Sequence, residues 1–232
     1  EGVEGLKDIF DPDKFSNMSS IGSTTSSVSG TSALSEFLKC WENSAMRNYI
    51  NGKVDYNSSP YVYKCITEDK KNYIMCDDLF TGNGNRNFGF GICFYVGYSR
   101  SFINQGYFAD EGVDITDSTY QTEGVSTLSV EIVDRVKERI IEDKRDEVRN
   151  MASSRGITLT DYQVDAVAAC RYQGWLMDDF LDAYKTYGLN PIIRNYSSGM
   201  GTSGARYEAN WKLFSTGVYT DENGDEIVLQ GD

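Results

Sequence analysis

The chain contains no histidine among its 232 residues. This absence excludes a Ser-His-Asp triad and the usual Cys-His pair, because both need an imidazole as the base. It also excludes a catalytic zinc ion that is held by histidine. If the protein is an enzyme, proton transfer falls mainly to its carboxylates. We therefore expect neither a metal nor another cofactor.

Cysteine is present, but not at a metal-binding or redox spacing. The residues Cys40, Cys65, Cys76, Cys93 and Cys170 include no CxxC pair, and we interpret them as mostly reduced core thiols. Cys65 and Cys76 flank a predicted turn. They are the pair that we expect to form a bridge if the environment is oxidising.

Positive charge and long apolar runs are also scarce. Lys and Arg number 22 against 35 Asp and Glu, a net charge of −13, which argues against nucleic acid as the main partner. No apolar run is long enough to span a membrane. The chain starts at Glu1 without an initiator Met or a leader. We expect a fragment or a processed piece of a longer protein, with more chain after the turn-like segment 221–225.

The composition predicts three regions along the chain. Residues 1–32 form an arm, with an apolar-acidic patch in 1–15 and then a Ser-rich linker. The linker has too few apolar groups to offset the entropy of ordering it. Residues 33–220 form the folded domain, and 221–232 form a tail. We expect the arm to attach the domain to a larger assembly.

The folded domain is predicted to be α+β. Leu34, Phe37, Leu38 and Trp41 share one helical face, which predicts a first helix that closes at Glu42. The region 47–110 that follows is dense in Tyr, Asn and Gly. We expect it to form a small antiparallel sheet after a turn at Asn51-Gly52, with strands at 61–66, 72–76 and 87–96.

From about residue 127 the apolar pattern becomes helical. It predicts a helix that stops near Gly156, and then a capping box at Thr160–Gln163 that opens the next helix. Two more helices are expected at 176–187 and 203–215, each followed by a glycine. The domain is thus one helix, a small sheet and a helical bundle.

Glu42 is the first candidate for chemistry. It lies at the edge of the apolar face of the first helix, where partial desolvation raises the pKa of a carboxyl group. A glycosidase needs such a protonated Glu as its general acid. The alternative is an ordinary solvated Glu at the end of a helix.

The second candidate is a turn followed by a glycine-containing strand. Asp77 and Asp78 precede the turn, and Gly89 and Gly91 alternate along the strand. Gly at alternate positions leaves one strand face bare, which lets a ligand approach the backbone closely. A β-bulge or a tight crossing against a helix explains the same pattern equally well.

Together these features resemble the phage-type lysozymes, the muramidases of glycoside hydrolase family twenty-four. That family opens with aromatic-Glu-Gly, a Tyr-x-Asp strand end and Thr-apolar-Gly-apolar-Gly-His. The corresponding segments here are Trp41-Glu42-Asn43, the Asp77/Asp78 region and Asn87-Phe88-Gly89-Phe90-Gly91-Ile92. The segment 159–167 is similar to the family's Gln-x-Asp-Ala helix, and 204–219 to its closing Arg-x-x-Glu and Leu-Phe-x-x-Gly-x-Tyr helix.

The chain also departs from the family pattern. Glu42 and Asn87 are 87 − 42 = 45 residues apart, which implies an insertion at about 50–72 that enlarges the sheet. Asn87 stands where the family has a Thr that helps hold the attacking water, and Ile92 replaces a structural His. The partner of Glu42 stays open: Asp78 is slightly favoured over Asp77, and either over Asp55 or Asn51.

The resemblance implies hydrolysis of the β-1,4 bond between N-acetylmuramic acid and N-acetylglucosamine in peptidoglycan. Glu42 is expected to protonate the glycosidic oxygen, an Asp to steer water or stabilise the transition state, and Asn87 to bind that water. Gly89, Phe90 and Gly91 are expected to contact substrate. The acidic charge and the arm favour a lytic domain carried in a phage tail, in contact with other tail proteins through 1–15. The alternative is an inactive lysozyme fold that serves as a structural or glycan-binding virion module.

Overall fold

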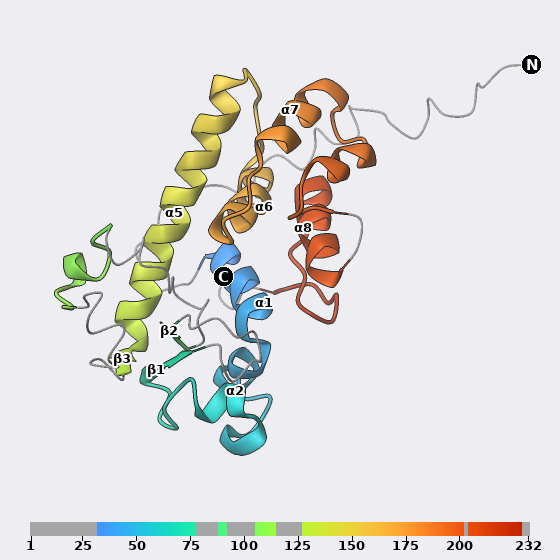
Figure 1. Ribbon diagram of the computed structural model, residues 1–232. Coiled ribbons are helices and arrows are strands. Elements are labelled where there is room, and N and C mark those ends of the chain that lie inside the picture. The colour runs from blue at the N-terminus through green and yellow to red at the C-terminus, as the bar shows by residue number, and fades with distance from the viewer. Residues whose placement is uncertain (1–31, 78–87, 92–104, 115–126, 202–203, 229–232) are drawn as a thin grey trace, which may run out of the picture. The chain divides into compact units, whose positions relative to one another are not determined.

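The computed structural model describes residues 32–77, 88–91, 105–114, 127–201 and 204–228 (Figure 1). All of them belong to one compact unit, Thr31–Asp232, and the chain divides from a first unit at Gly30. Helices and one antiparallel sheet make up this described part, so the α+β class is confirmed. Among the described helices, none combines the length and apolar composition that crossing a membrane requires.

The elements follow one another along the chain as α1 Ala33–Ile50, η3 Tyr56–Ser58, α2 Pro60–Tyr63, β1 Asn72–Asp77, β2 Phe88–Phe90, η5 Ala109–Glu111, β3 Thr127–Ser129, α5 Val130–Ser154, α6 Asp161–Tyr172, α7 Asp178–Tyr187, η6 Pro191–Tyr196 and α8 Ala205–Thr216. In Figure 1 the long helix α5 runs beside the sheet at its beginning and beside α6 further along. It therefore connects the sheet with the helical bundle.

The first helix is longer than expected and consists of two segments. Ser32 caps its start, because its side chain accepts a hydrogen bond from the backbone N–H of Ser35. The helix is interrupted at Asn43, where φ is −155° and ψ is 79°. A second segment then runs to Ile50 and ends in the turn predicted at Asn51-Gly52.

The sheet is antiparallel, with β1 between β2 and β3. Met75 pairs with Phe90 and Asp77 with Phe88, while Tyr73 pairs with Leu128 on the other side. The predicted strand 72–76 is confirmed. Of the predicted strand 87–96, Phe88–Phe90 is confirmed, and Asn87 and 92–96 lie outside the described residues.

Two expectations for this region are wrong. The predicted strand 61–66 is instead the short helix α2 and a turn, because Ser59 caps the backbone N–H of Tyr61 and Pro60 occupies the first helical position. The segment 50–71 therefore contributes mainly turns and short helices, and it joins the sheet only through a β-bridge between Ile66 and Tyr73 of β1. The helix predicted from residue 127 starts only after β3, because Ser129 both ends that strand and caps α5.

The helical half follows the sequence closely. The capping box at Thr160–Gln163 is present, and Gly156, Gly188 and Gly217 each follow a helix end as predicted. Cys40 and Cys170 are buried thiols, as interpreted, and burial raises the pKa of each to about 12. The side chains of Cys76 and Cys93 lie outside the described residues, so the bridge from Cys65 stays a prediction.

Two apolar clusters stabilise the unit, and α1 and α5 contribute to both. The helical core is formed by α6, α7, α8, the first segment of α1 and the second half of α5; it includes Leu34, Phe37, Leu38, Val148, Val167, Phe180, Leu213 and Phe214. The sheet-side core is formed around β1 and the second segment of α1; it includes Met46, Tyr49, Val62, Tyr73, Phe90, Phe108, Leu128, Val133 and Val136. The break in α1 lies at the junction of the two cores.

The chain folds back after α8. Thr220 and Glu226 form a β-bridge, and the Asp221 carboxylate accepts hydrogen bonds from the backbone N–H groups of Asn223 and Asp225. Ile227 then packs against the helical core. The segment expected to be a tail therefore continues the folded unit as far as Ile227, because this apolar side chain has a place to bury.

Candidate active site

Glu42 is the last residue of the first segment of α1, and its side chain is only 4% exposed. Arg206, in the first turn of α8, donates from Nη2 to Glu42 Oε1 at 2.6 Å. No second hydrogen bond to this carboxyl group is found within the described part of the chain. A buried carboxyl therefore meets one guanidinium at the junction between α1 and α8.

Two opposing effects act on the proton affinity of Glu42. Burial raises its pKa above the ordinary value of 4.5, because desolvation disfavours the charged form. The charge and the hydrogen bond of Arg206 lower the pKa, but burial outweighs them. The raised pKa that the sequence predicts is confirmed, whereas the neighbouring cation was not foreseen.

Asn43, the residue at the break in α1, forms hydrogen bonds that connect this part of the helix to two other parts of the fold. Its Oδ1 accepts from the Met46 backbone N–H at 3.0 Å, which caps the second segment. Its Nδ2 donates to the Tyr61 carbonyl at 2.9 Å and to the Gly91 carbonyl at 3.1 Å. The side chain next to Glu42 is thus bonded to the glycine strand that the sequence singled out.

The backbone conformation at Gly91 and the pairing of Gly89 in the sheet help explain why this strand contains glycines. Gly91 has a φ of +81°, which a residue with a side chain rarely adopts, and its N–H bonds to the Ile74 carbonyl at 3.1 Å. Gly89 pairs with Cys76 in the sheet. Phe90 is buried in the sheet-side core against Phe108. Gly89 and Gly91 are buried as well, so among the described residues none of the three expected substrate contacts exposes surface to a ligand.

The second carboxylate of the predicted site is only partly located. Asp77 ends β1 opposite Phe88, three residues or roughly 10 Å along the strand from Ile74. Its side chain, Asp78 and Asn87 lie outside the described residues. Asp55 and Asn51 are exposed in the turn region after α1. The preference for Asp78 or Asp77 as the partner of Glu42 therefore stays a prediction.

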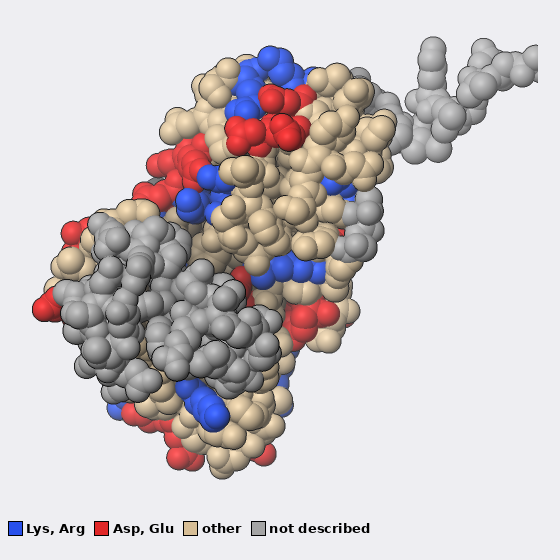
Figure 2. Space-filling model, viewed as in Figure 1, with Lys and Arg blue, Asp and Glu red and all other residues tan. Residues whose placement is uncertain are grey.

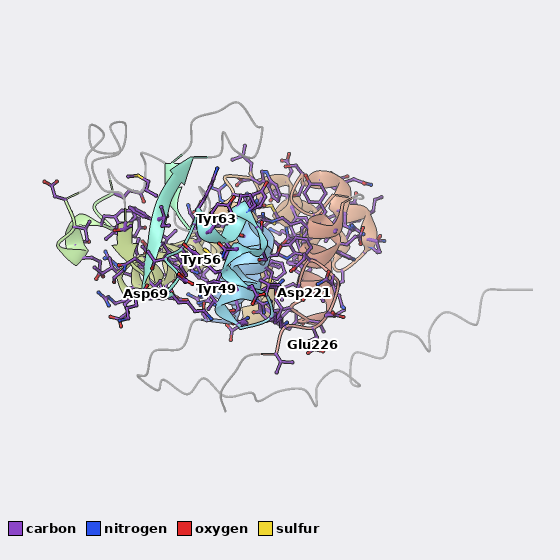
Figure 3. The ribbon with its side chains drawn as sticks, turned by 90° about the horizontal axis from the view of Figure 1, so that it is seen from below. Tyr49, Tyr56, Tyr63, Asp69, Asp221 and Glu226 are labelled. Atoms are coloured by element: carbon purple, nitrogen blue, oxygen red, sulfur yellow. The ribbon has the colours of Figure 1, made fainter. Side chains whose placement is uncertain are left out.

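Three tyrosines lie near the end of α1 and in the segment that follows it. Figure 3 shows Tyr49, Tyr56 and Tyr63 close together on α1, η3 and α2. Tyr49 is buried: its ring lies 5.5 Å from that of Tyr56, and its hydroxyl donates to the Glu68 carbonyl at 2.6 Å. Tyr63 is 38% exposed. Tyr49 therefore packs inside the domain, and Tyr63 is the tyrosine of these three that is exposed to solvent.

A groove of about 470 Å³ lies beside Trp41 rather than between sheet and bundle. Its other walls are one face of α8 and the turn after it; they are formed by Ala205, Glu208, Ala209, Lys212 and residues 220–224. Glu42 and Arg206 are not among the residues that line this groove. The resemblance to the phage-type lysozymes implies a cleft between sheet and bundle, and that cleft stays a prediction.

A second set of buried charges lies between α1 and α5. Lys39 is paired with Glu36 at 3.2 Å and with Asp134 at 3.6 Å, and Lys137 lies 3.6 Å from the same Asp134. The Tyr73 hydroxyl donates to Asp134 at 3.3 Å. Burial, together with the charge of the neighbouring Lys39, lowers the pKa of Lys137 to about 7.

On the face seen in Figure 2, basic and acidic side chains are interspersed over the described residues. Comparison with family models, with curated proteins and with solved structures gives no match. The functional interpretation therefore depends on the geometry around Glu42.

Sequence reasoning missed two residues of this site. Arg206 was noted only as part of the closing-helix pattern, and nothing local to it indicates that it meets a residue 164 positions earlier. Asn43 was noted only as the residue after Glu42. Its signal was an Asn within an apolar helical pattern, since Asn favours caps over helix interiors.

Proposed function

We propose that the protein is a peptidoglycan hydrolase, a muramidase of the phage-type lysozyme kind. The observation that carries the proposal is the buried Glu42 carboxyl, whose pKa is raised and whose neighbour in the chain, Asn43, is hydrogen-bonded to the Gly91 carbonyl. A general acid of a glycosidase needs this combination, because it must hold a proton at the pH at which it works. The order of motifs along the chain supports the same proposal.

In this mechanism Glu42 gives its proton to the oxygen of the β-1,4 bond between N-acetylmuramic acid and N-acetylglucosamine. Arg206 donates to Oε1 and cannot accept a hydrogen bond. The transferable proton is therefore carried on Oε2, and the guanidinium stabilises the carboxylate left after transfer. We infer that Arg206 orients the acid and assists its ionisation.

The partner carboxylate, Asp78 or Asp77, steers the attacking water or stabilises the oxocarbenium-like transition state. Asn87 binds that water in place of the family's Thr. A separation of about 6.5–9.5 Å between the two carboxyl groups leads to inversion, and about 5–5.5 Å leads to retention.

We further propose that this domain acts from a phage tail on the host cell wall. Its net charge of −13 gives no electrostatic attraction to an anionic wall, so delivery by a particle supplies the local concentration. The arm, 1–32, attaches the domain to other tail proteins. The alternative, an inactive glycan-binding module, is favoured by Asn87 and Ile92, which replace two family residues.

Product analysis separates the two functions. Purified peptidoglycan is incubated with the protein, the new reducing ends are reduced with borohydride, and the sugars are identified after hydrolysis. A muramidase produces muramitol, in an amount that grows with time. Binding to peptidoglycan without any new reducing end supports the inactive module, and glucosaminitol as the product contradicts the bond specificity.

A further inference from the structure

One side chain next to Glu42 makes three hydrogen bonds to three different parts of the fold. Asn43 is 4% exposed and bonds to the Met46 N–H, to the Tyr61 carbonyl and to the Gly91 carbonyl. Within α1 it is the residue with non-helical dihedral angles. The break of the helix and these bonds coincide at the residue that follows the proposed general acid.

The choice of Asn at this position is informative. Capping the second segment of α1 needs only a side-chain acceptor, and Ser, Thr and Asp provide one as well as Asn does. The two bonds to the Tyr61 and Gly91 carbonyls need two donors in addition. An amide combines one acceptor with two donors, whereas a hydroxyl has one donor and a carboxylate none. A cap alone does not require Asn, but the connection to the sheet does.

We propose that Asn43 is a positioning residue that fixes Glu42 relative to the glycine strand and the β1–β2 hairpin; this inference rests on the proposed hydrolase function. Glu42 and Asn43 share a peptide bond, so anchoring Asn43 to Gly91 anchors the backbone of Glu42. Arg206 holds the carboxyl of Glu42 from the opposite side, on α8. The acid is therefore held at two points, and small displacements of such a group are costly to the rate.

Asn43→Ser and Asn43→Ala separate capping from positioning. Ser keeps the acceptor that caps the second segment, and Ala keeps neither the acceptor nor the donors. We expect the melting temperature of Asn43→Ser to lie above that of Asn43→Ala. We expect kcat on peptidoglycan to fall at least tenfold in both variants, with KM changed less than twofold. Val148→Ala, a cavity in the helical core, is the control for lost stability and should keep the wild-type kcat.

A second measurement does not depend on turnover. Without its bond to Asn43 the Gly91 end of the strand loosens and admits water, so the pKa of Glu42 should fall toward its ordinary value. A ¹³C NMR titration of the Glu42 carboxyl in wild type, Asn43→Ser and Val148→Ala measures this change. We expect a shift in Asn43→Ser and none in Val148→Ala.

The outcomes distinguish this inference from the proposed function. A wild-type kcat in Asn43→Ser overturns the positioning role, while an inactive Glu42→Gln in the same assay leaves the hydrolase standing. If the wild-type protein cleaves no peptidoglycan, the proposed hydrolase is wrong. In that case an unchanged Glu42 titration in Asn43→Ser overturns the inference, and a lowered pKa in that variant alone supports it.

Discussion

Among the described residues, Asp165 and Glu42 are buried carboxyl groups that each pair with an arginine, and they differ in how fully they are hydrogen-bonded. Asp165 on α6 accepts from Arg145 Nε at 2.6 Å and Nη2 at 3.0 Å, and from the Tyr219 hydroxyl at 2.6 Å. Within the described ranges, Glu42 accepts from Arg206 only. Both carboxyl groups are buried, at 8% and 4% exposure.

The number of hydrogen bonds to each carboxyl group indicates which pair stabilises the fold and which carboxyl group is available for chemistry. Three donors on both oxygens of Asp165 are typical of a carboxylate that holds helices together, here α5, α6 and the chain after α8. In the pair of Glu42 and Arg206, burial outweighs the single donor and raises the pKa of the acid. We therefore expect mutations of the two acids to separate activity from stability.

The largest effect is expected for Glu42→Gln. This change keeps the shape and removes the proton, so the release of reducing ends from peptidoglycan should fall about 100- to 10,000-fold. The melting temperature should stay close to that of the wild type, since Gln Oε1 still accepts from Arg206. Near-wild-type hydrolysis by this variant removes Glu42 from the mechanism.

The second largest effect is expected for Asp165→Asn, which should lower the stability of the protein and not its activity. The change removes the charge of Asp165 and leaves the half-buried Arg145 paired with Glu142 only, so the free energy of unfolding should fall by about 2 kcal/mol. Urea denaturation measures the loss. Below the transition the variant should hydrolyse peptidoglycan at the wild-type rate per folded molecule. If Asp165→Asn loses turnover without losing stability, the proposed difference between the two pairs is wrong.

A smaller, pH-dependent effect is expected for Lys137→Met. Burial lowers the pKa of Lys137 from 10.5 to about 7, so below pH 7 the lysine is charged in both states and its full burial cost is present. Between pH 7 and 10.5 the unfolded chain binds the extra proton, and wild-type stability rises relative to the variant by up to about 1.4 kcal/mol per pH unit. Chemical denaturation of both proteins at pH 6 and pH 9 measures this change. An advantage of the variant that does not shrink with pH contradicts it.

The smallest effect is expected for removal of the arm. A chain that begins at Thr31 should fold, melt cooperatively and keep its activity, since the chain divides into units at Gly30. Limited proteolysis of the full chain should cut between Asn17 and Gly30. Insolubility or loss of cooperative melting in the shortened protein shows that the arm packs on the domain.

How much the sequence predicts differs between the two cores. In the helical core the signals are local: Thr160 and Gln163 form a capping box within one turn, and Gly188 and Gly217 stop helices directly before them. In the sheet-side core, different local sequence signals favour different secondary structures for the same segment. Tyr61–Ile66 has the composition of a strand, but Ser59 and Pro60 start a helix there.

In the candidate site, too, the features that depend on nearby residues were easier to predict than the contacts between residues far apart in the sequence. The raised pKa of Glu42 was one of two interpretations that the sequence left open, since the edge of an apolar helix face gives partial desolvation. Its exposure of only 4% is lower than that position predicts. Its pairing with Arg206 was not predictable, because the two residues are 164 positions apart and meet only through the packing of α1 against the bundle. The bond from Asn43 to Gly91 was missed for the same reason, at 48 positions.

The most direct test of the difference between the two pairs is the pKa of Glu42 itself. It is measured by ¹³C NMR titration of the carboxyl carbons, with Glu42→Gln to identify the signal. We expect a pKa above the ordinary 4.5 in the wild type. We expect a further rise in Arg206→Gln, because the guanidinium opposes the effect of burial. A Glu42 that titrates at or below 4.5 would contradict its role as a general acid.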